Sequence, residues 1–104
     1  MNSKAKGSRR ERQARDLLYS WGAIRVVRSG ASLGEFDLLG ICPGELLLVQ
    51  VKSNRWPSKA EMARLRAFPR LTYLKKLVFR YNDRQKHPEI RTISEEEYGT
   101  PSLD

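Results

Sequence analysis

The chain of 104 residues contains a single cysteine, Cys42, and a single histidine, His87. One cysteine cannot form an intramolecular disulfide, and the two residues together cannot complete a structural zinc site. The longest apolar run, residues 46–49, is far shorter than the roughly 20 residues that span a bilayer, and no apolar run follows the basic residues near the N-terminus. We therefore expect neither membrane insertion nor secretion, and a reducing, cytoplasmic location suits the chain.

Acidic residues are also few. Asp and Glu number 12 against 20 Lys and Arg, which gives a formal charge of +8 and an isoelectric point near 10.1. Such an excess of positive charge on a short chain attracts polyanions. Nucleic acid is therefore the expected partner.

The hydrophobic share of 39% is enough for one compact core. We expect a single domain over residues 1–94. The charged residues after Arg91 are all acidic, so residues 95–104 are predicted to form an acidic and mobile tail. No Walker loop or dinucleotide-binding glycine pattern is present, and no small-molecule cofactor is expected.

The spacing of apolar residues predicts a mixed α/β order of helix, three strands, helix and one or two strands. The first helix is predicted over residues 8–21, where apolar side chains recur at helical spacing before Gly22. A capping-box sequence from Ser58 to Glu61 opens the second helix, with Met62, Leu65 and Phe68 as its buried contacts. The predicted strands cover residues 23–28, 35–41, 45–52, 75–81 and 89–93.

The second and third of these strands are separated by Cys42, Pro43 and Gly44, which predicts a hairpin turning at the Pro-Gly pair. For a turn symmetric about that pair, the numbers of paired residues add to 87. Apolar residues on both faces mark the two strands as interior strands of a covered sheet.

This pairing has a consequence for the polar residues of the hairpin. Asp37 is predicted to lie opposite Gln50, and Glu35 opposite Lys52. Because side chains alternate between the faces of a strand, all four are predicted to project from one face, at the open end of the hairpin.

Acids and a lysine that converge at one end of a sheet, in a strongly basic chain, suit metal-assisted phosphodiester hydrolysis. Carboxylate oxygens hold Mg²⁺, which neutralises charge on the phosphate and lowers the pKa of a bound water. A lysine can orient that water or stabilise the pentacovalent state. Mg²⁺ is therefore the expected cofactor, with Mn²⁺ as a substitute.

Four segments resemble, in order, the signature segments of archaeal and viral Holliday junction resolvases. They are residues 6–12, residues 26–32, Asp37 at the start of a strand, and residues 50–53. The resemblance implies the restriction-endonuclease-like αβββαβ core of the PD-(D/E)XK nuclease superfamily, a central mixed sheet flanked by helices. It also implies a homodimeric endonuclease that makes paired cuts at four-way DNA junctions.

The resemblance assigns roles to individual residues. Glu11 and Asp37 would be metal-site carboxylates, and Gln50 stands where the family has a further acid. Lys52 would be the catalytic lysine. Ser32, with Ser29 as the alternative, would match a loop serine near the scissile phosphate. The implied DNA contacts are Arg9, Arg10, Arg28, Ser29 and Arg55.

The neutral Gln50 is a departure from the family pattern, because an amide oxygen can ligate Mg²⁺ but brings no charge. Glu35 is a candidate fourth metal ligand that would compensate. The departure also keeps two other functions open. One is a DNA-binding module with a degenerate nuclease fold, and the other is a different restriction-like nuclease.

Several of these residues also allow a purely structural interpretation. Glu11 could pair with Arg15 one helical turn later. Asp37 or Glu35 could pair with Lys52 across the hairpin. Ser32 could be an ordinary loop residue.

Overall fold

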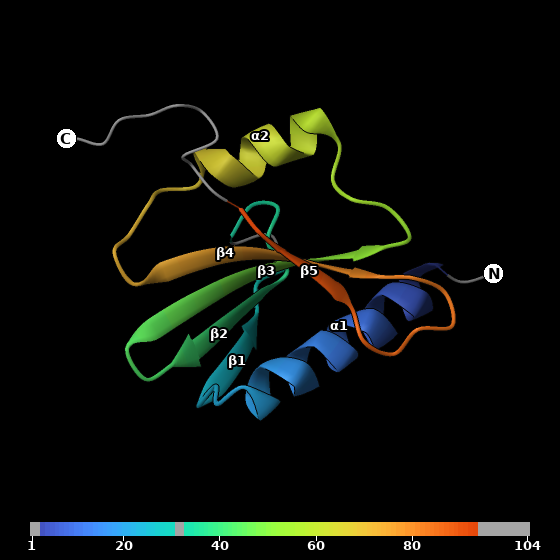
Figure 1. Ribbon diagram of the computed structural model, residues 1–104, viewed down its shortest axis with the longest axis horizontal. Coiled ribbons are helices and arrows are strands. Elements are labelled where there is room, and N and C mark those ends of the chain that lie inside the picture. Colours follow the sequence, from blue (N-terminus) through green and yellow to red (C-terminus); the bar gives the residue numbers. More distant parts are fainter. Residues whose placement is uncertain (1–2, 31–32, 94–104) are drawn as a thin grey trace.

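The structure of the protein is a computed structural model that describes residues 3–30 and 33–93 (Figure 1). Ser32 and the predicted acidic tail, residues 95–104, lie outside the described residues. Two helices and five strands follow one another in the predicted order. Their bounds are α1 Ser3–Ser20, β1 Arg25–Arg28, β2 Leu38–Cys42, β3 Glu45–Ser53, α2 Lys59–Ala67, β4 Leu74–Tyr81 and β5 Glu89–Thr92.

The strands form one mixed sheet in the order β1-β2-β3-β4-β5. Neighbouring strands are antiparallel except β3 and β4, which are parallel and are connected through α2. Helix α1 covers one face of the sheet and α2 the other (Figure 1). This arrangement confirms the predicted mixed α/β core of the restriction-endonuclease type. Neither helix, over the residues that the structure describes, has the length and apolarity that a membrane span requires.

The hairpin of β2 and β3 has the predicted register in all five of its pairs, of which Leu38 with Val49 is the one nearest the open end. Pro43 and Gly44 make the turn. Proline presets the backbone at the first central position, and Gly44 has φ of +76°, a value that side-chain-bearing residues rarely adopt. The Pro-Gly pair therefore fixes which residues of the two strands face each other.

The start of β2 differs from the prediction, because the strand begins at Leu38 rather than at residue 35. Gly34 has φ of +62°, and the Phe36 N–H donates to the Leu33 carbonyl at 3.1 Å. The chain is thus still turning at Glu35. The other strands begin and end within two residues of their predicted bounds.

Helix α1 begins earlier than predicted and packs on the sheet through the fully buried Ala14 and Leu18. Trp21, predicted as part of the apolar stripe, lies just beyond the helix and is exposed, although its ring makes a T-shaped contact with Phe79. Arg10 lies one turn before Ala14 on the buried side of the helix. A charged residue thus belongs to the stripe that holds α1 on the sheet.

Helix α2 opens with the predicted capping box. The Ser58 hydroxyl accepts from the Glu61 N–H at 3.1 Å, and the Glu61 carboxylate accepts from the Ser58 N–H at 2.9 Å. The fully buried Leu65, with Met62 and Phe68 beside it, packs on the opposite face of the sheet from α1. Burial of a leucine side chain of this kind contributes about 2 kcal/mol, so Leu65 helps to hold the helix on the sheet.

Candidate active site

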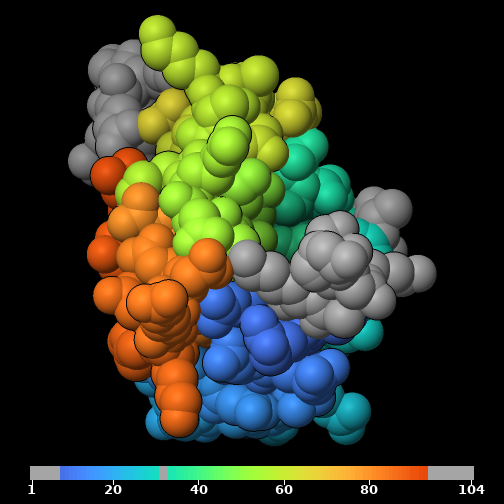
Figure 2. Space-filling model, turned by 90° about the vertical axis from the view of Figure 1, so that its right-hand side faces the viewer, coloured from blue at the N-terminus to red at the C-terminus, as the bar shows by residue number. Residues whose placement is uncertain are grey.

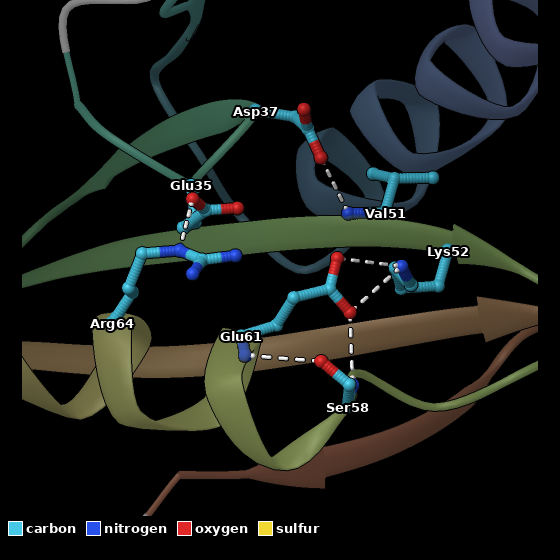
Figure 3. A network of polar contacts seen from close by, with 7 residues as sticks. All are labelled: Glu35, Asp37, Val51, Lys52, Ser58, Glu61 and Arg64. Atoms are coloured by element: carbon cyan, nitrogen blue, oxygen red, sulfur yellow. Dashed lines mark hydrogen bonds and ion pairs between the residues drawn. The ribbon is translucent and has the colours of Figure 1, made fainter.

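Asp37 lies at the open end of the hairpin, just before β2. Its N–H donates to the Val49 carbonyl at 2.8 Å, and its Oδ2 accepts from the Val51 N–H at 2.7 Å (Figure 3). These two partners flank Gln50, the residue predicted to lie opposite Asp37. The carboxylate therefore takes the place of a backbone acceptor where the regular ladder ends, which fixes its position beside β3.

A cavity of about 360 Å³ opens beside Asp37 and is also lined by Glu11, Arg28, Ser29 and Gly30. Glu11 comes from α1 and Arg28 is the last residue of β1, while the serine and glycine begin the loop that follows. Four residues that the sequence assigned to the site thus line one cavity, although they come from separate segments of the chain.

The cavity places Asp37 in an unfavourable electrostatic environment. Burial raises the pKa of Asp37 to about 6, although the hydrogen bond from the Val51 N–H opposes the rise. The negative charges of Glu11 and Glu35 raise the pKa further, and the ammonium of Lys52 lowers it. The ionised carboxylate is thus short of compensating positive charge.

Glu11 is paired with Arg28 across the mouth of the cavity. The Arg28 guanidinium lies 3.0 Å from the Glu11 carboxylate, and the arginine side chain is 71% exposed. Arg15 instead contacts Asp16 at 3.1 Å. The alternative of a helical pair between Glu11 and Arg15 is therefore wrong.

Lys52 contacts α2 and not the acids of the hairpin. Its Nζ lies 3.2 Å from both carboxylate oxygens of Glu61, while Glu35 accepts from Arg64 at 2.7 Å (Figure 3). The predicted sharing of one face is therefore wrong for Asp37, which lies before the first pair of the ladder, where strand alternation does not hold. Lys52 and Glu35 reach α2, whereas Asp37 lines the cavity with α1.

Gln50 is buried, with 5% of its surface exposed, and its Oε1 has no hydrogen-bond partner in the described part of the chain. An unsatisfied buried acceptor costs about 1–3 kcal/mol, so this oxygen would gain from a ligand or a water. Within residues 3–30 and 33–93, no group of three or more His, Cys, Asp and Glu is placed to hold a metal together. The oxygen donors that line the cavity are therefore the carboxylates of Asp37 and Glu11, and a metal contact of the buried Gln50 stays a prediction.

The predicted phosphate contact of Arg10 is wrong. Only 5% of the residue is exposed, and its guanidinium donates to the carbonyls of Asn82 at 3.3 Å and Gln85 at 3.2 Å. It also lies over the ring of Tyr81. Arg10 therefore joins α1 to the loop between β4 and β5 and is not offered to DNA.

Ser29 is likewise buried and does not suit the predicted DNA contact. Its hydroxyl donates to the Phe36 carbonyl, and its N–H donates to the Asp37 carbonyl at 3.0 Å. Ser29 thus ties the loop after β1 to the segment that carries the catalytic candidate. The matching serine of the same loop, Ser32, lies outside the described residues.

Arg9 and Arg55 are exposed, and their contact with DNA stays a prediction. Figure 2 shows α1, the connection between β3 and α2, and the loop between β4 and β5 side by side on one face of the molecule. Arg9 belongs to the first of these elements and Arg55 to the second. The two predicted contacts are therefore contributed by neighbouring elements of one surface.

Two residues of the site were not predicted from the sequence, namely Glu61 and Arg64. The capping box predicts that the Glu61 side chain turns back toward the N–H of Ser58. The capping box does not predict the contact of Glu61 with Lys52, because that contact forms only when α2 packs over the sheet.

Comparison of the sequence with known protein families gives a further finding. The family model described as archaeal Holliday junction resolvase (hjc) matches residues 2–68. No curated protein and no solved structure matches the chain. The matched residues include α1, the first three strands and α2, and hence every residue of the candidate site. The chain therefore belongs to the archaeal Holliday junction resolvase family, a family of junction-resolving endonucleases.

Proposed function

We propose that the chain is a divalent-metal-dependent endonuclease that cuts four-way DNA junctions at the cavity of Asp37. The observation that supports this most strongly is the state of the Asp37 carboxylate, which is half-buried beside Glu11 and has a pKa raised to about 6. An acid desolvated next to another acid gains free energy from a bound cation. In a chain with a formal charge of +8, such a site suits a phosphodiester substrate.

The residues present fit magnesium. Asp37 and Glu11 offer carboxylate oxygens at the cavity, and Gln50 on the adjacent strand would offer an amide oxygen that has no partner in the described part of the chain. Mg²⁺ prefers oxygen ligands and keeps several waters, so it does not need a complete cage of protein ligands. Mn²⁺ would accept the same donors. When bound, the ion would neutralise charge on the phosphate and make water more acidic.

The remaining chemistry belongs to Lys52 and Arg28. Lys52 approaches from the α2 side, where its ammonium would donate to a phosphate oxygen or orient the attacking water. Arg28 is exposed beside the cavity. When DNA binds, its guanidinium would leave Glu11 and bind a phosphate. This exchange would free Glu11 to bind the metal.

A four-way junction requires two cuts, which a single site does not provide at once. A homodimer with one site in each subunit would match the two-fold symmetry of the junction and place paired cuts in opposite strands. The exposed Arg9 and Arg55 would contact the phosphates of the arms.

A second candidate function is a DNA-binding module that shapes junctions without cutting them. The specific observation that favours it is that the cavity holds two carboxylates, with the neutral Gln50 in place of a further acid. Metal affinity should be lower than in a site with three acids. The same basic surface would bind junctions in either case.

The test is a cleavage assay on a labelled four-way junction, a linear duplex of matched sequence and a fork, each with Mg²⁺, with Mn²⁺ or with a chelator. The proposal expects paired cuts in the junction with either metal and none with the chelator. Binding to the junction without cleavage under all conditions would favour the binding module. Equal cutting of the duplex and the junction would point to a less specific restriction-like nuclease.

A further inference from the structure

Lys52 is held in place by a residue of a different element. Its Nζ lies 3.2 Å from each of the two carboxylate oxygens of Glu61, and both side chains are partly buried, at 21% and 26% exposed (Figure 3). A two-oxygen contact restricts the ammonium more than a single one does. An ion pair shielded from water is also less weakened by salt than an exposed pair.

Glu61 is itself fixed by the start of α2. One of its carboxylate oxygens accepts from the Ser58 N–H at 2.9 Å, and its own N–H donates to the Ser58 hydroxyl at 3.1 Å. The N–H of Ser58, and then the contact with Lys52, lower the pKa of Glu61. The carboxylate that faces Lys52 is thus ionised and oriented by the backbone of the first helical turn.

The other polar groups near Lys52 do not perform this task. Gln50, which precedes Lys52 by two residues on β3, carries no charge. Asp37 accepts from the Val51 N–H, and Glu35 is bound to Arg64. Among the residues that the structure describes, Glu61 is the one acid that forms an ion pair with Lys52.

We propose that Glu61 is a positioning residue for Lys52. It sets the place of the ammonium relative to Asp37, so that the first turn of α2 becomes a functional part of the nuclease site. This inference rests on the proposed function. Glu61 acts through Lys52 and needs no contact with metal or DNA.

The test compares wild type with Glu61→Gln. Glutamine also forms a capping box, so this variant keeps the start of α2 while removing the charge that holds Lys52. We expect the single-turnover rate of junction cleavage to fall by about 10-fold or more, as for other residues that orient a catalytic group. Junction affinity in chelator and the Mg²⁺ concentration for half-maximal rate should stay within about twofold, and the melting temperature should be nearly unchanged.

Two controls separate positioning from helix stability and from net charge. Ala63→Gly weakens α2 at an exposed position outside this network, so it should lower the melting temperature and cut at nearly the wild-type rate. Glu89→Gln makes the same change of charge in the ion pair with Arg80 and should be neutral for cleavage.

Each outcome bears on the inference. A wild-type rate in Glu61→Gln overturns it, and so does an equal loss of rate in Ala63→Gly, which would show that helix stability alone matters. A raised Mg²⁺ requirement in Glu61→Gln would make Glu61 a metal ligand and also overturns positioning. If wild type cuts no junction with any metal, the proposed function fails first, and that result is distinct from an unaffected variant of an active enzyme.

Discussion

The guanidinium of Arg28 lies 3.0 Å from the carboxylate of Glu11, so the group expected to meet phosphate and the group expected to meet metal neutralise each other in the free protein. Under the proposed function, binding of DNA and binding of metal would therefore be coupled through this ion pair. A phosphate bound to Arg28 would free Glu11 for the metal, and a metal bound to Glu11 would free Arg28 for phosphate.

This pair gives a prediction for Arg28→Gln. Junction affinity should fall, and the slope of log affinity against log salt should decrease by about 0.9, the loss expected for one phosphate contact. At the same time the Mg²⁺ requirement should drop, because Glu11 has lost its competing cation. Filter binding over a salt series and Mg²⁺ titration of the cleavage rate measure the two effects. Arg25→Gln, on the same strand, is the control and should leave the Mg²⁺ requirement unchanged. A Mg²⁺ requirement that does not move in Arg28→Gln would contradict the coupling.

Gln50→Glu tests the neutral member of the site. A carboxylate in place of the buried amide adds a charge toward the metal. Even at 4 Å in water a pair of unit charges gains about 1 kcal/mol, so the Mg²⁺ concentration for half-maximal cleavage should fall by about fivefold or more. In chelator the variant should melt at a lower temperature than wild type at neutral pH, because the added charge is buried without a partner. Gln85→Glu, which is exposed, should change neither quantity. An unaltered Mg²⁺ requirement in folded Gln50→Glu would remove Gln50 from the site.

Arg10→Ala tests the structural role that replaces the predicted phosphate contact. The variant loses two hydrogen bonds to loop carbonyls and the contact with the Tyr81 ring. The free energy of unfolding should fall by about 2 kcal/mol, measured by urea denaturation. The exposed Arg9→Ala should change it by less than about 0.5 kcal/mol. If Arg10→Ala were as stable as wild type but bound junctions weakly, Arg10 would be a DNA contact after all.

The fold could be predicted from local signals that the structure confirms. The Pro-Gly pair at Pro43 and Gly44 sets the register of the hairpin, and Ser58 with Glu61 sets the start of α2, because both depend on residues close together in the sequence. Gly34 was the signal for the late start of β2, since its positive φ keeps the chain turning.

The contacts of the site were harder to predict, because they depend on how distant elements pack. The pairing of Lys52 with Glu61 requires α2 to cross back over the sheet, which no local pattern specifies. The spacing of α1 did indicate that Arg10 is buried, because it lies four residues before the buried Ala14 and eight before Leu18 on the same stripe. Its positive charge instead suggested a contact with DNA. A basic residue on an apolar stripe is a candidate for a buried guanidinium as much as for a phosphate contact.

Burial also gives a pH dependence. The pKa of Asp37 is raised to about 6 from its ordinary value of 3.8, so the folded protein holds the proton more tightly than the unfolded chain does. The stability that protonation contributes is complete below pH 3.8 and is lost as the pH rises through about 6. Asp37→Asn should therefore raise the melting temperature in chelator at pH 8, and the gain should vanish toward pH 4. Asp16→Asn, which is exposed, should show no such trend. An equal gain for Asp37→Asn at both pH values would show that the charge is not the cause.

Cleavage of a labelled four-way junction by wild type and by Asp37→Asn, in parallel with Mg²⁺, tests the central claim most directly. Removal of the carboxylate takes away a metal ligand and also a negative charge that repels phosphate. Wild type should therefore make paired cuts, and the variant should make none while binding the junction as tightly as wild type or more tightly. Cutting by folded Asp37→Asn at the wild-type rate, or no cutting by wild type with any divalent metal, would contradict the account.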